Sequence, residues 1–83
     1  MRELKLGKYT HFKSKEKIYE VLGVSLHTET EEELVIYKAL YESKDFPYGQ
    51  IWARPKESFL AKVPIGKDNP TGQIYRFEYV DET

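Results

Sequence analysis

The side chains best suited to acid–base chemistry are the two histidines, His11 and His27. An imidazole titrates near neutral pH, and a neighbouring carboxylate can orient it for proton transfer. Glu29 follows His27 by two residues, so a small enzyme with a His/Glu pair is one interpretation. The simpler interpretation is a histidine at the rim of the fold that hydrogen-bonds to the backbone. We therefore assign no catalytic residue and keep the enzyme as an alternative.

Other catalytic and cofactor chemistries find no support in the residue pattern. The chain has no cysteine, which excludes thiolate nucleophiles, thiolate metal ligands and disulfides. A zinc site needs three or four ligands, and no spacing around the two histidines supplies them. Gly66 and Gly72 bracket a turn, without the strand–loop–helix context of a phosphate-binding loop. We therefore expect neither a metal nor a cofactor.

Trp52 and Arg54 are the leading candidates for ligand binding. Because they are two residues apart on an expected strand, they point to the same face. A guanidinium stacks on aromatic rings and binds carboxylate or phosphate groups bidentately. Small barrels bind extended peptides or unstacked bases on aromatic surfaces beside such a cation. The candidate ligand-binding residues are Trp52, Arg54, Tyr48, Phe46 and His27.

The charged residues suggest a second candidate surface. Residues 1–17 hold six Lys or Arg against two Glu, a net charge of +4, whereas residues 18–46 carry a net charge of −5. The basic segment interleaves aromatic residues with lysines, which suits phosphate backbones and unstacked bases. The total charge of −1 and the acidic 29–33 segment argue against a polyanion. The alternative nucleic-acid site comprises Lys8, Tyr9, Lys13 and Lys15.

Length and hydropathy limit the class of protein. The 83 residues suffice for one domain with one small core, so a substrate would lie in a surface groove or at a subunit interface. Residues 1–20 carry scattered charges, and the apolar runs are too short to span a bilayer. We expect a cytoplasmic protein without membrane contact, and a homodimer remains open.

The elements that position these candidates read as strands, because aromatic and β-branched residues are plentiful. The pattern predicts strands over residues 8–13, 17–27 and 51–54, with a turn at 14–16. Gly23 interrupts the alternation of the second strand, and a glycine there indicates a bulge or a sharp bend. Pro55 suits the first position of a helical turn that directs Phe59 and Leu60 inward.

Two further segments complete the expected sheet. Residues 34–41 combine helical spacing and a capping box, Thr30 with Glu33, with strand-forming residues that alternate, and we favour a strand. Residues 74–80 predict a last strand with Tyr75, Phe77 and Tyr79 inward. The chain is therefore expected to be all-β, a small SH3-like β-barrel of five or six short strands with one helical turn after Pro55. Closing the sheet would remove exposed edges.

A family resemblance covers most of the chain and supports this interpretation. It is carried, in order, by GKYTHFK (7–13), YEVLGV (19–24), HTET (27–30), ELVIYKALY (33–41) and WARP (52–55), with Phe59 and Arg76-Phe77 at its end. These segments resemble the bacterial "domain of unknown function 1653" family. The resemblance implies a compact SH3-like barrel and brings no activity. The chain departs from the pattern at Leu26, where a basic residue would be typical, and at Lys56 and Ser58, where apolar residues would be.

These observations together predict a single small β-barrel domain over residues 1–83. We expect a non-catalytic binding module that uses the aromatic and arginine surface for a peptide, a protein or a small anionic ligand. The alternatives are a barrel that binds single-stranded RNA or DNA and a small enzyme with a His/Glu pair. The first would show affinity that falls steeply with added salt.

Overall fold

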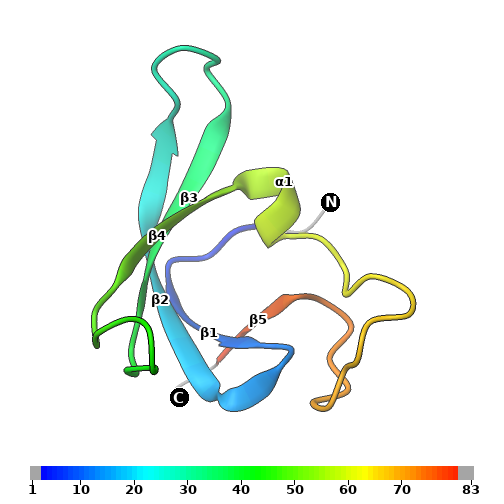
Figure 1. Ribbon diagram of the computed structural model, residues 1–83. Coiled ribbons are helices and arrows are strands. Elements are labelled where there is room, and N and C mark those ends of the chain that lie inside the picture. Colours follow the sequence, from blue (N-terminus) through cyan, green and yellow to red (C-terminus); the bar gives the residue numbers. More distant parts are fainter. Residues whose placement is uncertain (1–2, 81–83) are drawn as a thin grey trace.

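The computed structural model describes residues 3–80 of the chain and shows a strongly curved sheet capped by one short helix (Figure 1). Every pair of neighbouring strands is antiparallel, and the strand order is β4-β3-β2-β1-β5. The protein is therefore all-β, as predicted. The strands are β1 (Gly7–His11), β2 (Ser14–Leu26), β3 (Glu33–Ala39), β4 (Ile51–Pro55) and β5 (Phe77–Tyr79), and the helix is α1 (Lys56–Phe59).

The sheet is barrel-like but not strictly closed, which corrects the expectation of a closed sheet. β4 and β5 are its two edges, and the described residues form no ladder between them. β5 has three residues and pairs with β1 alone, while a single bridge joins Lys62 to Tyr75. The short helix α1 lies over the opening instead (Figure 1). The inner face of the sheet is thus covered by a helix and a loop on the side where a barrel would close.

The bend in β2 comes from a bulge at the predicted place. The pairing with β3 shifts between Val21 and Gly23, so that one extra residue on β2 faces no partner. A bulge increases the local twist, which lets the 13-residue strand serve both the body of the sheet and a projecting hairpin with β3. The prediction from Gly23 is confirmed.

Residues 33–39 form a strand rather than a helix. Val35, Tyr37 and Ala39 are buried, while the residues between them are half-buried. This period of two places one face of the strand on the core, and the helical spacing of the sequence does not correspond to a helix. Thr30 caps no helix, because its hydroxyl accepts a hydrogen bond from the N–H of Glu32 in the hairpin.

Aromatic rings fill most of the core between the sheet and α1. The buried cluster contains Phe59 from α1 and Phe77 from β5, whose rings stack 4.2 Å apart. Tyr9 and Tyr37 each meet Phe59 edge-on at 5.3 Å. Such pairs contribute about 0.5–1.5 kcal/mol each beyond the area they bury. The predicted inward direction of Phe59 is confirmed, and α1 is anchored by that one ring.

Two predicted boundaries are wrong. The first turn lies at residues 12–13 rather than 14–16, because Phe12 is buried there. The last strand begins at Phe77, and Tyr79 is 46% exposed rather than inward. Before it, the N–H groups of residues 74 and 75 both donate to the carboxylate of Glu78. Those local bonds replace a ladder, so the first half of the predicted strand is irregular.

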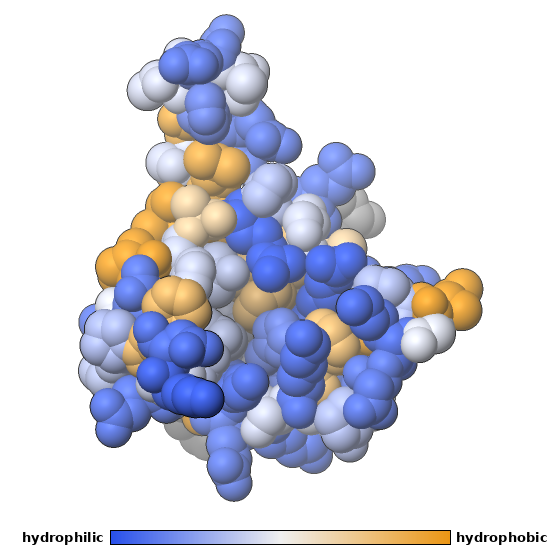
Figure 2. All heavy atoms as spheres, viewed as in Figure 1, coloured by the Kyte–Doolittle hydropathy of each residue, from blue (hydrophilic) through white to orange (hydrophobic). Residues whose placement is uncertain are grey.

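The hairpin of β2 and β3 projects beyond the body of the molecule. Figure 2 shows apolar residues gathered along this projection, below its hydrophilic tip. Leu22, Val24 and Leu26 of β2 are exposed there. Among the described residues, no helix has the length and apolarity required to cross a bilayer.

Candidate functional site

A small hollow where β1 turns into β2 collects cationic side chains from four separate segments. Its volume is about 150 Å³. Lys13 comes from the β1–β2 turn, Arg54 from β4, Lys67 from the loop after α1, and Arg76 from the residues before β5. We call it the basic hollow, and its lining residues are His11, Phe12, Lys13, Arg54, Pro64, Lys67 and Arg76.

None of the residues that line the basic hollow is an acid. Ion pairs join Lys38 to Glu20 and Lys56 to Glu33, and no residue of either pair lines the hollow. Four cationic residues therefore line one small volume without a carboxylate among them. Such an arrangement focuses a positive potential into the hollow and attracts anions.

Internal contacts fix the position of Arg54. Its Nε donates to the hydroxyl of Tyr37 and one terminal nitrogen donates to the hydroxyl of Ser58, both at 3.3 Å. The guanidinium also lies 5.4 Å above the ring centre of Phe77. These contacts hold Arg54 in place. Because they do not use all five N–H groups of the guanidinium, Arg54 still has donors for a ligand.

Arg76 contributes the one buried side-chain polar atom that lacks a hydrogen-bond partner in the described part of the chain. Its Nε is buried and makes no hydrogen bond there. The backbone of Arg76 is clamped, because its N–H donates to Ala61 and its carbonyl accepts from Phe12. A buried donor without an acceptor loses its hydration without compensation, and such groups are rare in folded proteins. The Nε donor of Arg76, a residue that lines the hollow, is thus left unsatisfied by the described residues.

His11 lies at the edge of the basic hollow as a neutral ring. It stacks on Phe12 at 4.7 Å and meets Phe77 edge-on at 4.9 Å. Desolvation by burial, helped by nearby cations of which Arg54 is the largest contributor, lowers the pKa of His11 to about 4. Its Nδ1 accepts the N–H of Lys13 at 3.2 Å, so the neutral ring carries its proton on Nε2. His11 is therefore a hydrogen-bond donor at neutral pH.

Trp52, Phe46 and Tyr48 are not among the residues that line the basic hollow. Trp52 and Arg54 do share the inner face of β4, opposite Tyr37 and Val35 of β3, as predicted. Trp52 packs on the core, and Phe46 meets it edge-on at 4.8 Å. Phe46 and Tyr48, on the loop before β4, are 45% and 63% exposed. Phe46 and Trp52 thus form an aromatic contact, and Tyr48 is exposed on the same loop as Phe46.

His27 does not join the other predicted ligand-binding residues. It lies at the tip of the β2–β3 hairpin, whereas Trp52 lies toward the opposite end of β3 (Figure 1). Its Nδ1 accepts the backbone N–H groups of Glu29 and Thr30 at 3.1 and 3.3 Å. His27 thus stabilises a turn through backbone hydrogen bonds. It lies too far along the hairpin to bind the same ligand group as Trp52 and Arg54.

The four residues of the alternative nucleic-acid site are not brought together as a binding surface. Tyr9 is 3% exposed, and its hydroxyl exchanges hydrogen bonds with the backbone of Lys5, so its ring cannot stack on a base. Lys13 lines the basic hollow, and Lys15 is exposed on β2. Lys8 pairs with Glu20 across the β1–β2 ladder. Burial of Tyr9 in the core corrects its predicted role.

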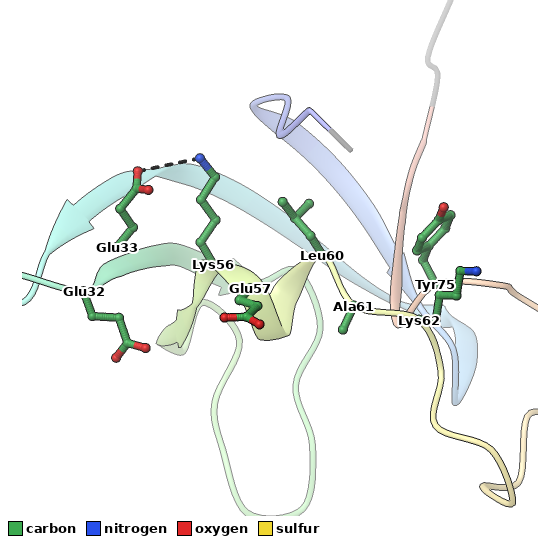
Figure 3. Close-up of a pocket in the computed structure, with 8 residues that line it drawn as sticks. All are labelled: Glu32, Glu33, Lys56, Glu57, Leu60, Ala61, Lys62 and Tyr75. Carbon is green, nitrogen blue, oxygen red and sulfur yellow. Dashed lines mark ion pairs between the residues drawn. The ribbon is translucent and has the colours of Figure 1, made fainter. Parts of the chain in front are cut away.

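A larger open groove, of about 720 Å³, lies between the start of β3, α1 and Tyr75 (Figure 3). Its charges are mixed: Glu33 pairs with Lys56 at 3.6 Å across it, and Lys62 extends beside Tyr75. The groove lacks the uniform charge of the basic hollow. Its lining residues are Glu32, Glu33, Lys56, Glu57, Leu60, Ala61, Lys62 and Tyr75.

Sequence reasoning missed two members of the basic hollow, Lys67 and Arg76. Lys67 lies in the loop after α1, and Arg76 belongs to residues 74–80, which the sequence predicts as a regular last strand. No local spacing connects them to Lys13 or Arg54, since the four residues meet only through the curvature of the sheet. The regular alternation predicted around Tyr75 gave no sign of the irregular backbone that brings Arg76 to the hollow.

Comparison with known proteins identifies the family of this chain. The sequence model of a family described as "Protein of unknown function (DUF1653)" matches residues 7–79. Because this match spans most of the 83 residues, the chain belongs to that family, as the resemblance in its sequence implied. No curated protein and no solved structure matches it significantly.

Proposed function

We propose that this member of the DUF1653 family is a non-catalytic binding module whose ligand carries an anionic group. The anionic group binds in the basic hollow, between Arg54 and Arg76. The observation that carries the proposal is the convergence of four cationic side chains on a small volume that no acidic residue lines. Guanidinium groups bind carboxylates and phosphates through strong, charge-assisted hydrogen bonds.

The size of the hollow supports recognition of a headgroup rather than of a whole ligand. Pockets that enclose drug-sized molecules measure about 300–1,000 Å³, and the hollow measures about 150 Å³. The rest of a peptide, protein or small molecule therefore lies outside it. Trp52 and Phe46 offer aromatic contact there, because Trp52 shares its face of β4 with Arg54.

The surroundings of His11 favour binding over proton transfer. Its Nδ1 already accepts the N–H of Lys13, and no carboxylate lines the hollow to orient the ring. A general base near neutral pH has a pKa close to the operating pH, whereas burial lowers the pKa of His11 to about 4. The ring is better suited to donate a hydrogen bond to a bound anion.

Anion titrations followed by amide and imidazole NMR signals at low ionic strength test the proposal. We expect phosphate or a carboxylate to produce saturable shifts at residues 11–13, and Arg54→Met to weaken them. The matched control is Lys15→Met, which removes an exposed cation that does not line the hollow. Shifts that are linear in anion concentration, or equal losses in the two variants, would show diffuse ionic screening and reject the proposed site.

A further inference from the structure

We infer, resting on the proposed anion-binding function, that the group held in the basic hollow is a phosphate monoester. Four observations lead to this class of ligand: the four separate segments that supply the cations, the number of positive charges, the protonation state of His11, and the unpartnered Nε of Arg76.

The cationic residues of the hollow come from separate parts of the chain. Lys13, Arg54, Lys67 and Arg76 belong to four segments that are separated along the chain. A carboxylate is planar, and one arginine fork satisfies it bidentately within its plane. A phosphate monoester presents three terminal oxygens that accept hydrogen bonds in different directions. The tetrahedral group therefore uses the arrangement of cations more fully than the planar group does.

The charge of the hollow also matches a dianion. Four cations line it and none of its lining residues is acidic. A carboxylate carries one negative charge, whereas a phosphate monoester carries about −1.5 to −2 at pH 7, since its second pKa is near 6. The dianion compensates more of the mutual repulsion among the four side chains, so its affinity for the hollow should be higher.

His11 and Arg76 supply complementary donors. The proton of neutral His11 is on Nε2, because Nδ1 accepts the Lys13 N–H. The Nε of Arg76 is buried and makes no hydrogen bond within residues 3–80. Both groups donate and neither accepts, which suits terminal phosphate oxygens without a proton. His11 stays neutral over the range in which a phosphate monoester loses its second proton.

Three ligands that share one phenyl ring separate shape from charge. Phenyl phosphate is tetrahedral and mainly dianionic at pH 7.5, phenyl sulfate is tetrahedral and monoanionic, and benzoate is planar and monoanionic. By isothermal titration calorimetry at pH 7.5 we expect phenyl phosphate to bind about tenfold or more tightly than benzoate, an effect of one extra hydrogen bond to a charged group. At pH 5 its affinity should fall toward that of phenyl sulfate, whose own affinity should not change.

Variants locate the binding. Arg76→Met and Arg54→Met should each weaken phenyl phosphate binding by about tenfold or more, and Lys15→Met should leave it unchanged. Lys67→Met is a further test that does not depend on folding, because Lys67 is exposed on a loop. The Lys67→Met variant should keep the dispersed amide spectrum of a folded protein while its affinity for phenyl phosphate falls. Phenyl phosphate binding that none of the hollow variants changes would place the site elsewhere and overturn the inference.

The outcomes separate this inference from the proposed function. Benzoate that binds as tightly as phenyl phosphate, with the same dependence on Arg54 and Arg76, overturns the phosphate inference and leaves the anion-binding function standing. Failure of all three ligands rejects both. A phosphoserine peptide and a nucleoside monophosphate then distinguish the two sources of the group, since affinity above that of phenyl phosphate identifies the matching source.

Discussion

His11 shows how the surroundings of a single side chain set its protonation state. The ring is packed between Phe12 and Phe77, and the cations Arg54, Lys13, Lys17 and Arg76 add to the desolvation that lowers its pKa to about 4. In an unfolded chain the pKa of a histidine is about 6.5. Between these two values the unfolded chain binds the proton more strongly than the folded protein does.

We therefore predict that His11 makes the protein less stable as the pH falls from 6.5 to 4. Because the unfolded state binds more protons over this range, the free energy of unfolding rises with pH, and the contribution is complete above pH 6.5. The ring is partly exposed, so solvent screening reduces the effect to about 1–2 kcal/mol. Denaturant unfolding of wild type and His11→Gln between pH 4 and 7.5 measures it. A difference between the two proteins that is constant with pH would contradict the lowered pKa.

Backbone conformation makes two glycines unequal. Gly49 has a φ of +87°, in the left-handed region that L residues enter only at a cost, whereas Gly23 does not have a positive φ and has open space where a Cβ would be. We predict that Gly49→Ala lowers the free energy of unfolding by about 1–2 kcal/mol. Gly23→Ala should be neutral or slightly stabilising, because it reduces the freedom of the unfolded chain.

Chemical denaturation of the two alanine variants provides the comparison. Each adds one methyl group to a glycine, so a difference between them reports on backbone conformation rather than on side-chain volume. If Gly23→Ala proved the more destabilising, the bulge in β2 would need a conformation that only glycine adopts.

At the scale of the element, α1 exists because of one side chain. A four-residue helix has little stability of its own, since helix nucleation is unfavourable. Phe59 at its end is fully buried, stacked on Phe77 and edge-on to Tyr9 and Tyr37. Packing of this ring holds α1 over the opening between β4 and β5, where Ser58 then meets Arg54.

We predict that Phe59→Ala destabilises the protein by about 3–5 kcal/mol, the usual result of removing a buried phenyl ring. Ile65→Ala is the matched control, because Ile65 is fully exposed and its truncation should change stability by less than about 0.5 kcal/mol. Thermal unfolding by circular dichroism measures both. A small effect of Phe59→Ala would mean that the covering of the sheet does not depend on this ring.

Local patterns predicted the elements that alternate cleanly and failed where hydrogen bonds are irregular. The strand of residues 33–39 and the bulge at Gly23 followed from a period of two and its interruption. The last strand was overextended, because Glu78 binds the N–H groups of residues 74 and 75, a contact that hydropathy does not report. The first turn was misplaced because the sequence does not distinguish a buried Phe12 from a strand residue.

The candidate site was only partly predictable, because it depends on how the sheet bends. The same face for Trp52 and Arg54 follows from strand geometry and is confirmed. Lys67 and Arg76 reach the same hollow through an irregular loop, and no spacing in the sequence predicts that they lie close together. His27 was predicted to join the site, but it follows the end of β2 in the hairpin loop, away from Trp52 and Arg54.

At the scale of the whole molecule, the projecting hairpin leaves part of β2 without a neighbour on one side. β1 pairs with β2 only as far as Val21, and within residues 3–80 no other strand continues along that edge. The N–H of His27 bonds to Glu32 across the hairpin, so by the period of two the backbone groups of Val24 and Leu26 face away from β3. Exposed apolar side chains on such an edge favour pairing between molecules.

We therefore predict that Val24→Lys slows aggregation on heating while changing the melting temperature little, since Val24 is exposed and an added charge opposes edge-to-edge pairing. Ile65→Lys is the matched control, because it also replaces an exposed apolar residue by lysine, but on an irregular loop with no strand edge. Light scattering during a temperature ramp, at equal protein concentration, compares the three proteins. Slower aggregation with Val24→Lys alone assigns the association to the unpaired edge. Equal slowing in both variants would show that net charge rather than the edge governs it, because the two substitutions change the charge of the molecule identically.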